Sequence, residues 1–136
     1  MRNKEVADME ASLSLGVWNR ACGLALQIYA ITAECSDSVF REHMTDASLA
    51  LAAQIAAGYE RSSPRQFAHC LEQARSRCAE LRTQLYLAAQ LDLITLPRST
   101  ELMQESLEIS RQLHTLIVWC EAHPEQSLVT LRRPTE

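Results

Sequence analysis

Cysteine and histidine are the side chains of this sequence best suited to nucleophilic catalysis and to metal binding. The five cysteines contain no CxxC pair, and none of the four histidines stands at Glu-x-x-His spacing. Only Cys70 lies beside a histidine, His69, and neighbours in sequence do not face each other on a helix. The sequence therefore predicts no catalytic residue, no metal site and no cofactor, and we expect the protein not to be an enzyme.

A group of arginines could perform a second chemistry, the binding of phosphate, because guanidinium groups bind phosphate. Arg75 and Arg82 are seven residues apart, which places them on one face of a helix. Glu72 and Glu80 occur on the same stretch and are able to neutralise these charges. The pattern supports two interpretations, a solvated ion-paired face or a patch that binds the phosphates of RNA or DNA. The candidate nucleic-acid-binding residues are Arg61, Arg65, Arg75, Arg77 and Arg82.

Prolines mark the limits of the helices that must position these side chains, because proline inside a helix costs ~3 kcal/mol. The strongest start signal has Ser63 as N-cap, Pro64 at the first helical position and Gln66 placed to close a capping box. The predicted helices span about 10–34, 38–60, 64–92 and 98–122. The remaining tail, 123–136, has no apolar period, and we expect it to be poorly ordered.

Apolar residues recur at alternating spacings of four and three residues, as in the helices of a bundle. The third predicted helix carries Phe67, Leu71, Ala74, Cys78, Leu81, Leu85 and Ala88. The fourth carries Leu102, Ser106, Ile109, Leu113, Leu116 and Cys120, and the first carries Leu15, Trp18, Cys22, Ala25 and Ile28, with Trp18 as its anchor. Short links between these helices favour an all-α fold, an antiparallel up-down-up-down four-helix bundle that residues 1–136 form as a single domain.

The second predicted helix differs from the others because it is apolar nearly all round between Ala47 and Gly58. Such a helix is buried on several sides, and a neighbouring subunit would supply the additional cover. Gln54 lies in the middle of this stretch, and we expect its amide to make a structural hydrogen bond across helices. The candidate residues for core or oligomer packing are Ala47, Ala50, Gln54 and Ala57.

Charge and hydropathy indicate where the protein resides. The net charge of -4 opposes a broadly cationic surface for nucleic acid or membranes, although a local basic patch stays compatible with it. The longest uncharged runs, 21–33 and 47–59, are shorter than the ~20 residues of a membrane span. The first eight residues carry acids in place of the apolar run of a secretory signal. We expect no membrane contact and a cytoplasmic location.

The stretch 47–94 resembles a known family, the four-helix-bundle proteins encoded in intervening sequences of large-subunit ribosomal RNA genes. Relatives of that family include the accessory protein of diversity-generating retroelements. The resemblance rests on the run 47–59, on Phe67, Leu71, Ala74, Arg75, Ala79, Glu80, Leu81, Gln84, Leu85, Ala88 and Ala89, and on Leu15, Trp18, Ala21, Leu24 and Tyr29. It covers about 15–120. The chain departs from the family pattern at Asp46, Gln54 and Ala57, where arginine, asparagine and glutamate are usual.

The resemblance implies an antiparallel bundle that assembles as a homopentamer and has no known catalysis. In the retroelement branch it also implies a basic surface that engages reverse transcriptase and nucleic acid. Our leading hypothesis is therefore a non-catalytic, cytosolic homo-oligomer that acts as a scaffold or interaction module. The first alternative is a nucleic-acid-binding accessory protein that uses the arginines of the third helix. The second is an enzyme with a site between subunits, for which the sequence offers no candidate residues.

Overall fold

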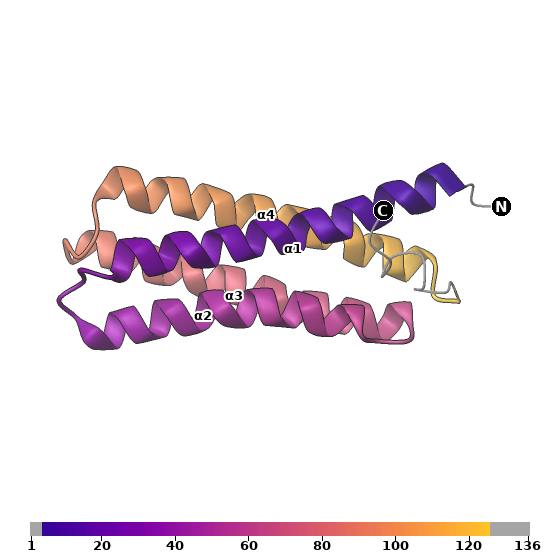
Figure 1. Cartoon of the computed structure of the whole chain (residues 1–136), viewed down its shortest axis with the longest axis horizontal. Coiled ribbons are helices and arrows are strands. Elements are labelled where there is room, and N and C mark those ends of the chain that lie inside the picture. The colour runs from indigo at the N-terminus through magenta and orange to yellow at the C-terminus, as the bar shows by residue number, and fades with distance from the viewer. Residues whose placement is uncertain (1–3, 126–136) are drawn as a thin grey trace.

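The computed structural model describes the backbone of residues 4–125 and the side chains of residues 16–125. Four helices follow one another in alternating directions: α1 (Lys4–Thr32), α2 (Ser38–Tyr59), α3 (Pro64–Gln90) and α4 (Leu96–Ala122). Each helix packs against the next in sequence, and α1 also contacts α4 (Figure 1). The predicted all-α, up-down-up-down bundle is thereby confirmed. Most of the predicted tail, from residue 126 onward, lies outside the described residues.

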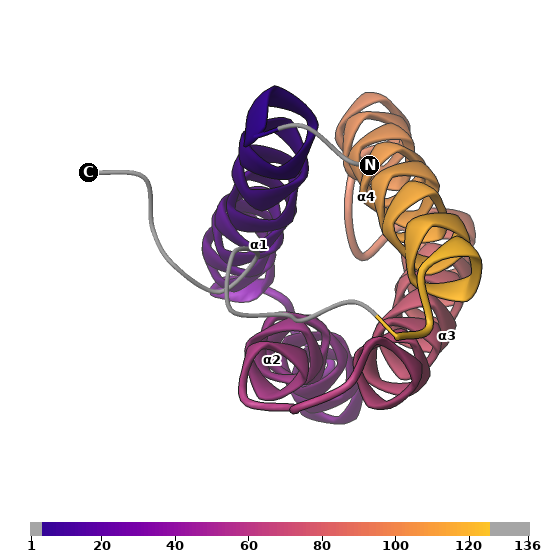
Figure 2. The same cartoon turned by 90° about the vertical axis from the view of Figure 1, so that its right-hand side faces the viewer.

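The first helix begins at Lys4, earlier than the expected start near residue 10, and ends at Thr32, before the expected residue 34. The sequence explains the early start, because residues 4–15 contain neither proline nor glycine. Their acids Glu5, Asp8 and Glu10 also lie near the helix N-terminus, where the helix dipole favours negative charge. The shift lengthens α1 beyond its partners, and its N-terminal end diverges from the other helices (Figure 2).

The predicted cap of α3 is confirmed, since the Ser63 hydroxyl accepts a hydrogen bond from the backbone N–H of Gln66 at 3.2 Å. The capping box is not formed. The Gln66 side chain accepts a hydrogen bond from the Ser62 hydroxyl at 3.2 Å instead of reaching back to the backbone of Ser63. The start of α2 has a cap of the same kind, in which the Asp37 carboxylate accepts from the N–H of Phe40 at 3.0 Å.

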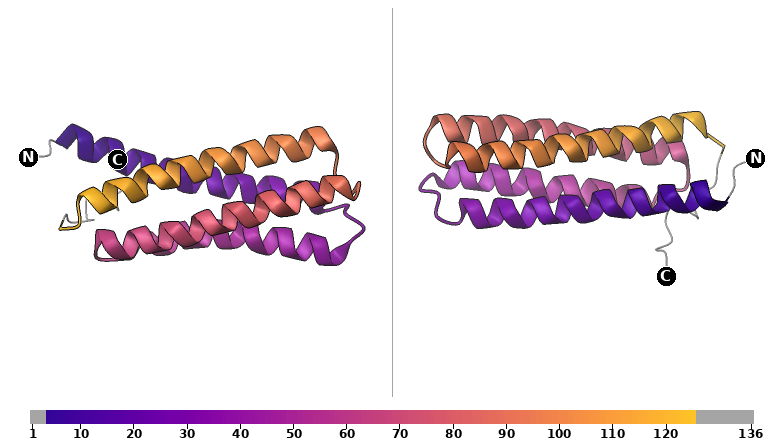
Figure 3. Two further views of the ribbon diagram at one scale, coloured as in Figure 1. Left: turned by 180° about the vertical axis from the view of Figure 1, so that it is seen from behind. Right: turned by 90° about the horizontal axis from the view of Figure 1, so that it is seen from above.

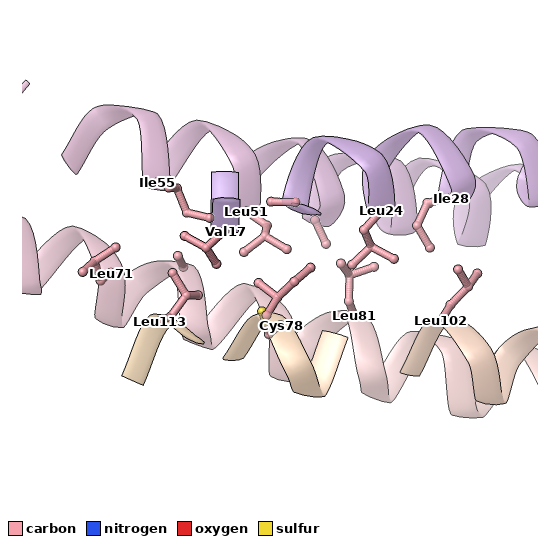
Figure 4. Packing of buried hydrophobic residues seen from close by; sticks show 14 of the residues in the cluster. Val17, Leu24, Ile28, Leu51, Ile55, Leu71, Cys78, Leu81, Leu102 and Leu113 are labelled. Carbon is pink, nitrogen blue, oxygen red and sulfur yellow. The ribbon is translucent and has the colours of Figure 1, made fainter. Parts of the chain in front are cut away.

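Every predicted seam residue of α3 and α4 is buried in one continuous core (Figure 4). The seam predicted for α1 is correct in its C-terminal half, where Ala25 and Ile28 are buried, but not at Trp18 and Cys22, which are only partly buried. The side chain of Leu15 lies outside the described residues. Val17 and Leu24 are fully buried there, whereas Trp18 is only half-buried and packs against the edge of the core. The bulk of the indole favours this edge position over the interior, where the smaller Val17 fits between helices. Trp18 therefore borders the core and does not anchor it.

Two serines fix the register of α4 against α3. The Ser99 hydroxyl donates to the carbonyl oxygen of Leu85 at 2.8 Å, and the Ser106 hydroxyl donates to that of Cys78 at 3.1 Å. From the first hydrogen bond to the second, α4 advances by seven residues, from Ser99 to Ser106. Over the same distance α3 runs back by seven residues, from Leu85 to Cys78, as antiparallel helices require. A shift along the helix axis would break both hydrogen bonds, so the two serines specify one alignment of the arginine-bearing α3 on α4. The two helices lie side by side along their length (Figure 3).

Candidate functional site

Two of the five candidate arginines, Arg75 and Arg82, lie along the edge of α3 that faces α4. Nε of Arg75 donates to the Ser110 hydroxyl at 3.5 Å, and its Nη1 lies 3.4 Å from Nδ1 of His114. Nη1 of Arg82 donates to the Ser106 hydroxyl at 3.3 Å. The two cations therefore form a strip along the α3–α4 edge, supported by hydroxyl and imidazole groups of α4.

The carboxylates around this strip neutralise it only in part. Oε1 of Glu72 lies 3.7 Å from Nη1 of Arg75, and both side chains are substantially exposed to solvent, so the ion pair is weak. Arg82 forms no ion pair within the described residues. The edge thus keeps a net positive charge, which suits a negatively charged partner.

Arg77 does not belong to this strip. It follows Arg75 by two residues, a rotation of about 200° around a helix, and so projects from another side of α3. Its Nη1 donates to Oε2 of Glu80 at 3.0 Å, which satisfies the guanidinium locally. The predicted arginine patch is accordingly divided, and Arg77 faces away from Arg75 and Arg82.

Arg61 and Arg65 occupy a third location, at the turn between α2 and α3. Both line a surface hollow of about 690 Å³ together with Ser63, Gln66, His69, Cys70 and Gln73. The sequence placed these arginines in one patch with Arg75 and could not reveal the hollow. Its walls come from the connection between α2 and α3 and from the first turns of helix α3. The relative position of the walls depends on how α2 packs on α3.

The alanine-rich helix α2 is only partly enclosed by the other helices of its own chain. Ala47 is buried, but Ala50, Gln54 and Ala57 are only partly buried, and Ala53 is exposed. Among the described residues Gln54 makes no side-chain hydrogen bond, so the expected contact across helices is absent within the chain. Helices α1 and α3 cover one side of α2, and its opposite side faces outward.

Large apolar side chains on the outward faces of α1 and α2 were not found by sequence reasoning. Leu26 and Tyr29 of α1 are 72% and 49% exposed, and Val39 and Leu49 of α2 are 60% and 47% exposed. Periodicity did not single them out because each lies off the buried seam of its helix. Side chains of the same kind are exposed on α3 and α4 as well, among them Tyr86 and Leu107, so every helix of the bundle presents apolar area that a partner is able to cover.

The cysteines and histidines do not converge on a reactive site in the part of the chain that the structure describes. No group of three or more His, Cys, Asp or Glu side chains there is arranged to hold a metal ion. Burial raises the pKa of the Cys78 thiol to about 11, although Ser106 and the nearby arginines oppose the shift. A thiol with such a pKa is a poor nucleophile at neutral pH. None of the four described helices is long and apolar enough to cross a membrane.

Fold and surface together define a small antiparallel helical-bundle protein whose distinctive features are outward apolar side chains and separated arginine sites. A model of the 23S rRNA-intervening sequence protein family matches residues 14–115. The chain belongs to this family. The resemblance noted for the alanine-rich stretch is thereby confirmed at the level of the family.

A solved structure shares the fold. It is the crystal structure of a protein with unknown function from the S23 ribosomal protein family, from Bacteroides thetaiotaomicron VPI-5482. The TM-score is 0.70 at 21% sequence identity, over 74% of this chain and 97% of that chain. No curated protein matches the sequence. The structural likeness supports the bundle architecture alone.

Proposed function

We propose that the protein is a non-catalytic cytoplasmic interaction module that assembles with copies of itself, as a pentamer. The observation that carries this proposal is the outward apolar surface of α1 and α2, which includes Leu26, Tyr29, Val39 and Leu49. Burial of such side chains between subunits would stabilise an assembly by ~25 cal/mol per Å² of apolar area removed from water. The number five follows from the family resemblance and not from this surface.

The partly buried residues of α2 fit the same role. Ala50 and Ala57 carry only methyl groups, so a helix of another subunit is able to approach their backbone closely. Gln54 lies between them and has amide donors and an acceptor without a partner among the described residues. A neighbouring subunit would satisfy this amide, which assigns to the oligomer the hydrogen bond that the single chain lacks.

Light scattering behind size-exclusion chromatography tests the assembly. We expect a mass of about five times the chain mass of 15.3 kDa. The double variant Leu26→Lys/Leu49→Lys should dissociate it, because two lysines per subunit would be forced into an apolar contact. The matched control is Leu107→Lys/Val118→Lys, which places the same charges on exposed apolar positions of α4. A wild-type mass of one chain at micromolar concentration would refute the proposal.

A second function, nucleic-acid binding by an accessory protein, is favoured by the strip of Arg75 and Arg82. In a ring the strip would recur in every subunit, so a weak local site would become a band of positive charge. Contacts of this kind go to phosphates, and binding should weaken steeply between ~50 and ~200 mM salt with little sequence preference.

Fluorescence anisotropy with single-stranded RNA and duplex DNA tests this second function. The variant Arg75→Glu/Arg82→Glu should abolish binding. The control Arg98→Glu/Arg111→Glu changes the net charge equally at a different edge of α4 and should retain most of it. Absence of binding by the wild type at low salt would remove this candidate.

A further inference from the structure

Among the described residues, those that line the hollow at the turn between α2 and α3 are cationic or neutral. Arg61, Arg65 and His69 supply positive or protonatable nitrogen, while Gln66 and Gln73 supply amides, and the described part of the chain adds no carboxylate to the lining. A volume of about 690 Å³ falls within the usual range for small-molecule sites. The hollow therefore has both the space and the charge for an anionic ligand larger than a bare ion.

Arg61 and Arg65 differ from the other arginines in the described part of the chain. The remaining seven each have a hydrogen-bond or ion-pair partner within it: Arg20, Arg41, Arg75, Arg77, Arg82, Arg98 and Arg111. For Arg61 and Arg65 the same region supplies neither a hydrogen-bond nor an ion-pair partner for the guanidinium group. These two arginines, exposed to solvent and without a partner in that region, thus line the same hollow.

The backbone that carries these two arginines is held in place on both sides. The N–H of Arg61 donates to the carbonyl oxygen of Gly58 at 3.1 Å, and Ser63 caps α3 just before Arg65. Gly58 also packs directly on Phe67, where an added Cβ would lie 2.7 Å from the phenyl ring. The positions at which both side chains leave the backbone are therefore defined before any ligand binds.

We propose that this hollow binds a phosphomonoester through the guanidinium groups of Arg61 and Arg65. Guanidinium matches the geometry of phosphate with paired, charge-assisted hydrogen bonds. His69 lies beside them and contacts Gln73 at 3.2 Å, so it is placed to add a further donor. The phosphomonoester has two potential sources, a free mononucleotide or the 5′-terminal phosphate of a nucleic acid. The proposal goes beyond self-assembly and does not involve Arg75 or Arg82.

One acidic side chain competes for this site. Arg65 also lines a smaller neighbouring hollow of about 280 Å³, to which Glu121 of α4 contributes a carboxylate. The negative charge of Glu121 attracts the guanidinium away from a phosphate and repels the phosphate itself. Glu121→Gln should therefore tighten phosphomonoester binding by about twofold, the effect typical of an exposed charge.

Isothermal titration of the full chain with adenosine monophosphate, inorganic phosphate and adenosine tests the site. We expect adenosine monophosphate to bind and adenosine, which lacks the phosphate, not to bind. The variant Arg61→Gln/Arg65→Gln should weaken binding at least about tenfold, because charge-assisted hydrogen bonds are lost. The control Arg98→Gln/Arg111→Gln removes the same charge elsewhere and should leave affinity unchanged.

Anisotropy with RNA oligonucleotides that carry a 5′-phosphate or a 5′-hydroxyl separates the two sources. Tighter binding of the phosphorylated oligonucleotide, lost in Arg61→Gln/Arg65→Gln, assigns the site to nucleic-acid ends. Binding of the mononucleotide with no such preference assigns it to a free ligand. Equal weakening by the two double variants, equal binding of adenosine, or no heat with any phosphate compound would overturn the proposal. These readouts are independent of oligomer mass, so they succeed or fail separately from self-assembly.

Discussion

Arg20 of α1 and Glu105 of α4 form a bidentate ion pair, with Nε to Oε2 at 2.9 Å and Nη2 to Oε1 at 2.6 Å. Glu108 adds a second carboxylate 3.5 Å from Nη1 of Arg20. Further along the same boundary, Arg98 of α4 donates to Gln27 of α1 at 3.4 Å. Polar side chains thus reinforce the contact between α1 and α4, which share one apolar core, as Ser99 and Ser106 reinforce the contact between α3 and α4.

Replacement of Arg20 by alanine should therefore weaken the docking of α1. Because the two side chains are 38% and 26% exposed, we expect the free energy of unfolding to fall by only about 0.5–1 kcal/mol. The loss should shrink at ~1 M salt, where exposed charges are screened. Urea denaturation at low and high salt measures both effects. Arg111→Ala, on the 66% exposed partner of Glu108, is the control and should cost less.

Glycine positions in the helices should respond to alanine in opposite directions. At Gly58 a Cβ would lie 2.7 Å and 2.9 Å from two atoms of the buried Phe67 ring, so Gly58→Ala should destabilise the fold by about 1–3 kcal/mol. At Gly23 a Cβ would meet nothing within 4 Å, so Gly23→Ala should stabilise α1 by about 0.5–1 kcal/mol. Thermal unfolding followed by circular dichroism compares them. A stabilising Gly58→Ala would contradict the close packing of α2 on α3.

The hydrogen bond from Ser106 to the carbonyl of Cys78 should contribute measurably to the α3–α4 contact. Ser106→Ala removes it, together with the hydroxyl that accepts from Arg82, and should cost about 0.5–1.5 kcal/mol. Ser110→Ala is a matched control, because its hydroxyl is only partly buried and its contact with Arg75 is long at 3.5 Å. Chemical denaturation of both variants checks the difference. Equal stability of the two would show that the buried hydrogen bond has no net effect.

Helices with a clear hydrophobic period could be predicted from the sequence, whereas features that two helices form together could not. The seam from Phe67 to Ala88 follows from spacing alone, because one buried side repeats along a regular helix. Trp18 was misplaced because spacing does not tell which of two adjacent stripes on α1 faces the core. The side of α2 that carries Gln54 could not be assigned for a related reason, since composition does not tell the side of an alanine-rich helix that packs within the chain from the side that faces outward.

The arginine sites show the same limit of prediction from sequence spacing. The common edge of Arg75 and Arg82 follows from their seven-residue spacing. The separation of Arg61 and Arg65 from them depends on the turn after α2 and on the approach of Gly58 to Phe67, which no sequence period encodes. A tertiary contact therefore decides which positive charges act together.

Glu108 should stay ionised to an unusually low pH. Its hydrogen bond with Arg111 lowers the pKa of this carboxyl to about 2, with further help from Gln112 and Arg20. Because the folded-state pKa lies below the unfolded one, the stabilising effect is present above the unfolded pKa and is lost as pH falls through about 2. Carboxyl ¹³C NMR against pH measures the shift. Arg111→Gln should move the pKa of Glu108 up toward its ordinary value, and an unchanged titration would refute this origin.

The thiols of Cys22 and Cys78 should react with alkylating reagents at very different rates. Cys22 is partly exposed, whereas Cys78 is fully buried between α3 and α4 and has its pKa raised to about 11 by that burial. At pH 8 the thiolate of Cys78 is therefore scarce as well as inaccessible. Mass spectrometry after timed exposure to iodoacetamide should find Cys22 modified first and Cys78 modified only once the chain unfolds in urea. Early modification of Cys78 in the folded protein would mean that the contact between α3 and α4 opens readily, contrary to the packing of its serines and apolar seam.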